Sequence, residues 1–165
     1  MENVQVNIRD VVQSQILNHL RAHPDTMNYG IELFYGAFSA ELFAEFIHSK
    51  LQAGKPMVFA RCGSHNSRQQ LDTMGTVHNT DLEVEVVVAS NIVRDKEFGS
   101  FSRFTDKMLR DVKTVCSEEN FAVEIPDTGN FNLVWRSDES LFRVPALSMD
   151  AQRVNYQLQG LVYQL

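Results

Sequence analysis

Residues 81–90 restrict the fold more than any other stretch, because their apolar pattern changes partway along. As a β-strand they would place four apolar side chains on one face: Leu82, Val84, Val86 and Val88. The other face begins with Glu83 and Glu85 and ends with Val87 and Ala89. We therefore expect a central strand that is covered on both faces at one end and is wet on one face at the other end.

Three amphipathic helices are predicted around this strand. Residues 98–116 are expected to form the covering helix, because six apolar residues recur there with the helical period: Phe101, Phe104, Met108, Leu109, Val112 and Val115. A second helix is predicted over 7–22, with Asn7 as its N-cap, and a third over 40–53, with Ser39 as its N-cap. The buried face of the helix over 40–53 is predicted to contain Leu42, Phe43, Phe46, Ile47 and Leu51.

The remaining segments are predicted as strands and two long irregular regions. Short strands are expected at 31–36, 57–63 and 121–126, and a long closing strand at 152–165. A phase slip at Gly160 predicts a β-bulge in the closing strand. Residues 64–79 are polar without a period, which predicts a long loop, and residues 127–150 are predicted to be a loop or a hairpin arm.

This order of elements defines the expected fold class as α/β (α+β): a mixed β-sheet packed with about three helices, long loops and a long C-terminal strand. The 165 residues are expected to form a single domain, 1–165, because no linker or internal repeat interrupts them. A hydrophobic content of 44% is enough for a core.

Charge and cysteine content exclude several classes of protein. The net charge of −6 argues against a dedicated nucleic-acid-binding protein, which would be basic. Cys62 and Cys116 lie far apart and without metal-like spacing, so we expect two reduced, buried thiols. The first residues lack a basic region and an apolar segment, and no apolar run is long enough to span a membrane. We therefore expect a soluble protein made in a cytoplasm.

The strand, polar turn and helix over 84–101 could form a phosphate-binding rim, but the glycines that such a rim needs are missing. Only Gly99 lies between Asn91 and the helix, and the Gly-Lys of "AGKP" at 53–56 is followed by Pro56 instead of a hydroxyl residue. The turn is therefore interpreted as a connection between sheet and helix and not as a ligand site.

Other catalytic or metal-binding patterns are equally weak. His19 and His23 have a zinc-compatible spacing, but Pro24 ends their helix, and we interpret them as surface histidines. Glu83 and Glu85 are interpreted as exposed acids, and Cys62 near His65 as a buried thiol. Trp135 and the phenylalanines have the spacing of core residues. The residues thus predict no enzyme, no catalytic site, no cofactor and no metal.

Three stretches resemble one known family. They are "IRDVVQSQILNHLRA", "AGKPMVFARCG" and, above all, "VEVVVASNIVRDKEFGSFSRFTDKMLRDVKTVC". In their order along the chain and in their local residue patterns, these stretches are similar to the tail terminator proteins of long-tailed and contractile-tailed phages, in particular the Mu-like branch. The resemblance covers most of the chain, but residues 117–145 have no counterpart in it.

The resemblance implies a virion structural protein that assembles in the host cytoplasm and remains at the neck-proximal end of the tail. Such proteins form a ring, commonly a hexamer, that caps the tail tube, stops its polymerisation and offers a surface for head–tail joining. The implied partners are other copies of the chain, the tail tube protein, the sheath protein of a contractile tail and the neck proteins. DNA would pass through the ring without specific binding, and an acidic lumen would let it slide.

Loops that follow strands are the expected contact regions of such a subunit. The candidate interface residues are Arg61, His65, Arg68, Gln69, Gln70, Asp72, Arg94, Asp95 and Lys96. Alternative functions are another head–tail joining or tail-completion subunit, a small enzyme, or a free-standing binding domain.

Overall fold

A mixed six-stranded sheet is the framework of the computed structural model. The strand order is β1 (Gly30–Leu33), β2 (Met57–Cys62), β5 (Glu83–Ser90), β8 (Met149–Gln159), β7 (Gly129–Val144) and β6 (Val123–Ile125). Only β1 and β2 are parallel, and the other neighbours are antiparallel. The structure describes residues 8–33, 40–51, 55–62, 70–72, 75–77, 82–91, 104–125, 129–144 and 149–159.

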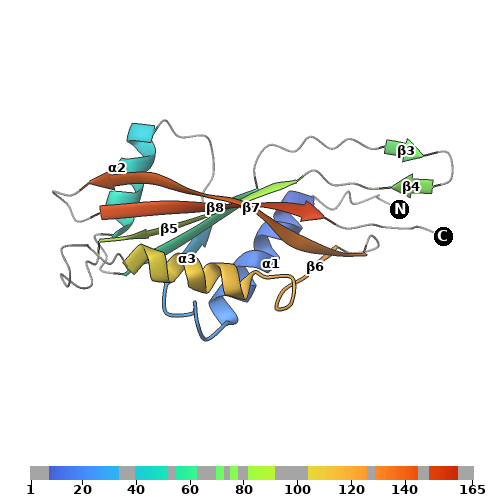
Figure 1. Cartoon of the computed structure of the whole chain (residues 1–165), viewed down its shortest axis with the longest axis horizontal. Coiled ribbons are helices and arrows are strands. Elements are labelled where there is room, and N and C mark those ends of the chain that lie inside the picture. The colour runs from blue at the N-terminus through green and yellow to red at the C-terminus, as the bar shows by residue number, and fades with distance from the viewer. Residues whose placement is uncertain are drawn as a thin grey trace, which may run out of the picture.

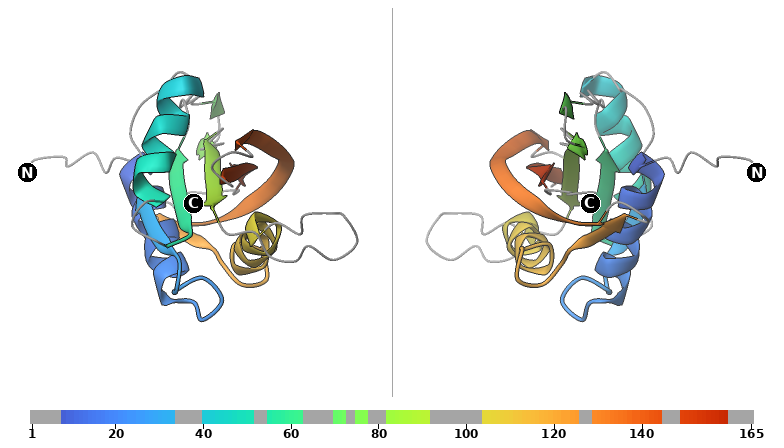
Figure 2. Two further views of the ribbon diagram at one scale, coloured as in Figure 1. Left: turned by 90° about the vertical axis from the view of Figure 1, so that its left-hand side faces the viewer. Right: turned by 90° about the vertical axis from the view of Figure 1, so that its right-hand side faces the viewer.

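Helices lie on both faces of this sheet (Figures 1 and 2). The helices α1 (Ile8–Ala22) and α3 (Phe104–Val115) pack on one face, and α2 (Ala40–Leu51) packs on the other. The expected mixed α+β architecture is therefore confirmed. Within the described residues, none of these helices is both long and apolar enough to span a membrane.

Each face of the sheet has its own hydrophobic core. The main core joins α1 and α3 to the even-numbered side chains of β5, including the fully buried Val86 and Val88. The smaller core joins Ile47 and Leu51 of α2 to Val87, Ala89 and their neighbours Met57, Phe59, Met149 and Ala151. The predicted change along β5, from one buried face to two, is confirmed.

The strands curl so far that both edges of the sheet reach α1, and α1 side chains bind backbone groups of both edge strands. On β1, Arg21 Nη2 donates to the carbonyl of Ile31 at 2.8 Å. On β6, the side-chain amide of Gln15 accepts from the Glu124 N–H at 2.8 Å and also donates to the Glu124 carbonyl. Gln15 thus binds Glu124 as a neighbouring strand would, and it blocks that position for another chain.

The helices and short strands agree with the sequence predictions, while Asn7, Ser39, Phe101 and Gly160 lie outside the described residues. The prediction for the covering helix was incomplete. The helix α3 covers β5 only on the Val86 face, and α2 covers the Val87 and Ala89 face. Leu42 was wrongly placed in the core: it is 56% exposed, because Ile47 and Leu51 face the sheet from another side of α2.

The two regions predicted as irregular contain strands. The strands β3 (Gln70–Asp72) and β4 (Gly75–Val77) pair as a separate two-stranded sheet, which Figure 1 shows standing apart from the main sheet. Most of 127–150 belongs to β7, which pairs with β8 as one arm of a long hairpin. Its alternation is hidden in the sequence because the pairing register shifts twice, between Trp135 and Ser137 and between Ser140 and Phe142.

The apolar stripe of α1 is expected to be essential for stability. Leu20 is fully buried in the main core, so Leu20→Ala should lower the free energy of unfolding by about 2–5 kcal/mol through lost burial and a cavity. Urea denaturation followed by circular dichroism measures this loss. Asn18→Ala, at an exposed position of the same helix, should change stability by less than about 0.5 kcal/mol. Equal effects of the two variants would contradict the packing of α1.

Candidate interaction surfaces

Four charged side chains form a row across four neighbouring strands. They lie on the sheet face that packs against α2, at the end of that face that α2 leaves exposed to solvent. We call Arg61, Glu85, Arg153 and Glu139 the charge ladder. Arg61 Nε donates to Glu85 Oε2 at 3.0 Å. Arg153 lies 3.6 Å from Glu85 Oε1 and also pairs with Glu139. Opposite charges thus alternate from β2 through β5 and β8 to β7, and each charge has a partner on the next strand.

The ladder changes the interpretation of the two acids on β5. Glu83 is exposed, as predicted. Glu85 was also predicted to be an exposed acid, but its side chain is only 17% exposed and lies between two arginines. A carboxylate in this setting links neighbouring strands through its two arginine partners.

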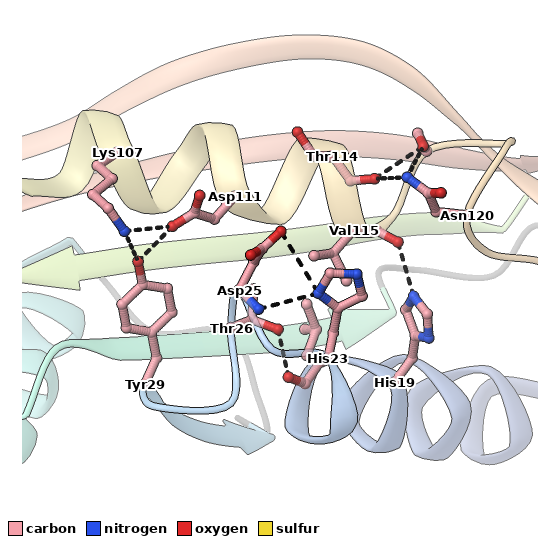
Figure 3. Close-up of polar contacts among 12 residues, drawn as sticks. His19, His23, Asp25, Thr26, Tyr29, Lys107, Asp111, Thr114, Val115 and Asn120 are labelled. Carbon is pink, nitrogen blue, oxygen red and sulfur yellow. Dashed lines mark hydrogen bonds and ion pairs between the residues drawn. The ribbon is translucent and has the colours of Figure 1, made fainter.

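The junction between α1 and α3 contains a second polar group, shown in Figure 3. Tyr29 Oη donates to Asp111 Oδ2 at 2.6 Å. Lys107 Nζ donates to the same carboxylate at 3.0 Å and to Tyr29 Oη at 3.2 Å. These contacts connect the turn after α1 to α3.

The pKa values of Tyr29 and Lys107 are both raised within this group. Burial, together with the hydrogen bond to Asp111, raises the pKa of Tyr29. The hydrogen bond to Asp111 raises the pKa of Lys107 as well. Near neutral pH Tyr29 is therefore a neutral phenol and Lys107 an ammonium, and neither group is poised to exchange a proton. A general acid or base would need a pKa near the operating pH.

His19 of α1 and His23, which directly follows this helix, also have structural contacts. The His19 ring stacks on Phe121, with 4.4 Å between the ring centroids, and His19 Nε2 lies 2.8 Å from the carbonyl of Val115. His23 Nδ1 accepts the Asp25 N–H at 3.2 Å in the turn that ends the helix. Both residues were predicted to be surface histidines, and both are half-buried. Within the described residues, no three metal-ligating side chains come together.

Both cysteines are free, buried thiols, as predicted. Burial raises the pKa of Cys62 to about 12, although the charge of Arg9 opposes this shift. Burial also raises the pKa of Cys116 to about 12. Neither sulfur is therefore a thiolate near neutral pH, and neither has the character of a nucleophile.

An exposed aromatic residue is the clearest surface feature of the described chain. Trp135 of β7 is 52% exposed, although its spacing predicted a core residue. Its Nε1 donates to Asp138 Oδ1 at 2.8 Å, and Lys113 Nζ lies 4.8 Å from the ring centroid. Lys113 also pairs with Asp138 Oδ2 at 2.8 Å. The register shift after Trp135 brings Trp135 and Asp138 to the same side of β7, beside α3.

The contacts with Lys113 and Trp135 stabilise the negative charge of Asp138. Burial alone would raise the pKa of this carboxyl group. The hydrogen bonds from Lys113 and Trp135, together with the lysine charge, more than offset burial and lower the pKa. Asp138 is therefore ionised at neutral pH and stays ionised to a lower pH than a carboxyl group with an ordinary pKa. Its charge keeps both partners oriented.

The structure describes only part of the predicted interface. Arg61 lies in the charge ladder on the α2-facing side of the sheet, whereas Trp135 lies beside Lys113 of α3. Gln70 and Asp72 lie in β3, where their backbones pair with Val77 and Gly75 of β4. The other predicted interface residues lie outside the described part of the chain: His65, Arg68, Gln69, Arg94, Asp95 and Lys96. Whether these residues contact a partner stays a prediction.

Sequence reasoning missed five residues of the two surfaces: Lys113, Trp135, Asp138, Glu139 and Arg153. The pairing of Glu85 with Arg153 depends on β5 and β8 being neighbours, which no local pattern reveals. The exposure of Trp135 depends on the register shift beside it. The one available signal was the run "WRSDES" at 135–140, which is too polar for the core position assigned to its tryptophan.

Comparisons with known proteins give little further information. No protein-family model matches the sequence, and no curated protein matches it. Among solved structures, a chain in the virion of a native gene transfer agent particle superimposes with a TM-score of 0.48 and 11% sequence identity. The match covers 90% of this chain and 95% of that chain. A TM-score below 0.5 does not establish a common fold, so this match leaves the function open.

The charge ladder should contribute to stability through Glu85. Glu85→Ala leaves Arg61 and Arg153 facing each other without the carboxylate. It should therefore lower the free energy of unfolding by about 1–3 kcal/mol. Glu83→Ala, at an exposed position of the same strand, is the matched control and should be nearly neutral. Urea denaturation of both variants measures the difference, and a neutral Glu85→Ala would show that the ladder is not stabilising.

The reactivity of the two thiols should depend on whether the protein is folded. A pKa of about 12 for both cysteines favours the neutral thiol in the folded state, so stability should decline as the pH rises from about 9 toward 12. At pH 8 the folded protein should react with a disulfide reagent at least about 100-fold more slowly than the urea-unfolded protein, whose thiols have ordinary pKa values. The release of the reagent's chromophore measures both rates. Rapid labelling of either cysteine in the folded state would contradict this description of the thiols.

Proposed function

We propose that this protein is a virion structural subunit of the tail terminator type, which forms a ring on the end of the tail tube and stops its growth. The observation that carries the proposal is the stretch 84–116, which resembles tail terminators. Its two ends fold as β5 and α3, the strand and helix at the centre of the main core. The proposed partners are the tail tube, the neck proteins and, in a contractile tail, the sheath.

The chemistry of the described residues agrees with a protein that acts through its contact surfaces. Burial keeps both thiols neutral and raises the pKa of Tyr156, and the acids Glu85 and Asp111 are each bound by basic side chains. These groups support packing between strands and helices. The described chain therefore offers contacts to a partner more readily than it offers a reacting group.

The geometry also agrees with capping. A cap must bind the end of a stack and must not offer the next subunit an equivalent site. Gln15 and Arg21 occupy backbone groups of the two edge strands, which removes one common route to open-ended growth through strand addition. The β3–β4 hairpin stands apart from the body (Figure 1) and provides an arm that can reach a neighbouring subunit or the tube.

The ring itself requires two different complementary surfaces on each subunit, since a closed ring is built from heterologous contacts. The two sides of the sheet differ as this requires. The helix α3 lies on one side and α2 on the other (Figure 2). Trp135 lies on the side of α3, next to Lys113, and the charge ladder lies on the side of α2.

A capping assay tests this proposal. Purified protein added to growing tail tubes should halt their elongation, and electron microscopy should show a ring at one tube end. Deleting the gene should give tails of uncontrolled length, and the plasmid-borne gene should restore normal length. The free protein at high concentration should have a mass near six times the 18.8 kDa of one chain. Tails of normal length in the deletion strain would contradict the proposal.

A further inference from the structure

The surface around Trp135 has the properties of a binding hot spot. We call Arg110, Lys113, Trp135, Arg136 and Asp138 the tryptophan surface. The indole is 52% exposed, and contacts with Lys113 and Asp138 hold it in place. A large aromatic side chain that is already ordered loses little conformational entropy when a partner covers it. Tryptophan is also among the residues most enriched in binding hot spots.

Two further basic residues adjoin Lys113 and Trp135 along the chain. Arg110 lies one turn before Lys113 on α3, and Arg136 follows Trp135; both are exposed. Within the described part of the chain, neither arginine has an ionic partner. A local excess of positive charge is unusual in a chain with a net charge of −6. The partner of this surface should therefore combine an apolar side chain with an acid.

The outer face of α2 has this composition. Leu42, Glu45 and Ser49 are exposed at helical spacing, so they lie on one side of the helix. Leu42 is 56% exposed, and Glu45 has no ionic partner among the described residues. Because α2 and α3 lie on opposite faces of the sheet, the two surfaces point to different sides of one subunit, as a ring contact requires.

We propose that the tryptophan surface of one copy binds the outer face of α2 of the next copy. The proposal rests on the ring assembly proposed above and names the surfaces that make it. Trp135 packs against Leu42 of the neighbour, and Glu45 of the neighbour faces Arg136 and Arg110. The contact is heterologous, so each subunit uses one surface toward each of its two neighbours.

Complementation between two variants tests this contact. Trp135→Ala damages one surface and Leu42→Lys damages the other, and each variant alone should be monomeric, with subunit association weakened at least about 30-fold. Mixed in equal amounts, they should form a dimer that grows no further, because only one intact pair of surfaces remains. Analytical ultracentrifugation measures the masses. Met27→Lys is the matched control, since Met27 is 54% exposed but belongs to neither surface; it should assemble as the unmodified protein does.

A charge exchange gives a second readout that does not depend on truncating Trp135. Arg136→Glu and Glu45→Arg should each weaken association, and the double variant should regain part of it. Circular dichroism of every variant checks that it is folded.

The outcomes separate this contact from the terminator function. Rings formed by folded Trp135→Ala or Leu42→Lys would overturn the proposed contact and leave the terminator function intact. The lack of a mixed dimer, with both single variants monomeric, would also overturn it, because a heterologous contact requires that dimer. An unmodified protein that stays monomeric at all concentrations and on tail tubes would overturn the ring, and the contact with it.

Discussion

The contact of α1 with both edges of the curled sheet is the constraint on which the rest of the structure depends. The buried stripe of α1 fills the main core, and its polar side chains reach β1 on one side and β6 on the other. The helix closes an open sheet much as a further strand would close a barrel. The curl in turn brings α3 beside β7, where Lys113, Trp135 and Asp138 meet.

The two faces of the sheet therefore have different roles. The face toward α1 and α3 is apolar along most of its length and supplies the larger core. The face toward α2 is apolar only at one end, and Arg61, Glu85, Arg153 and Glu139 continue it with alternating charges. An open sheet face with charges paired strand to strand resists nonspecific association. Specific contacts are then left to discrete sites such as the surface around Trp135.

A ring subunit that acts by capping needs a rigid body and few, well-placed contacts. The rigidity comes from the two cores and from the Tyr29, Lys107 and Asp111 group, which ties the turn after α1 to α3. In the proposed cap, side chains that bind the edge strands would limit growth by strand addition. The proposed contact between Trp135 and the outer face of α2 would then direct the association of subunits into a closed ring.

The sequence alone determined the helices, the central strand and the buried thiols, because hydrophobic periodicity and cysteine spacing are local properties of the chain. It indicated that β5 is exposed to solvent on one face at one end and is covered on both faces at the other end, and the structure confirmed this. The tertiary structure decided which helix lies on which face, why Leu42 and Trp135 are exposed, and that Glu85 meets Arg153. Strand order and the two register shifts of β7 set these features, and both depend on pairing between segments far apart in the chain, which no local pattern encodes.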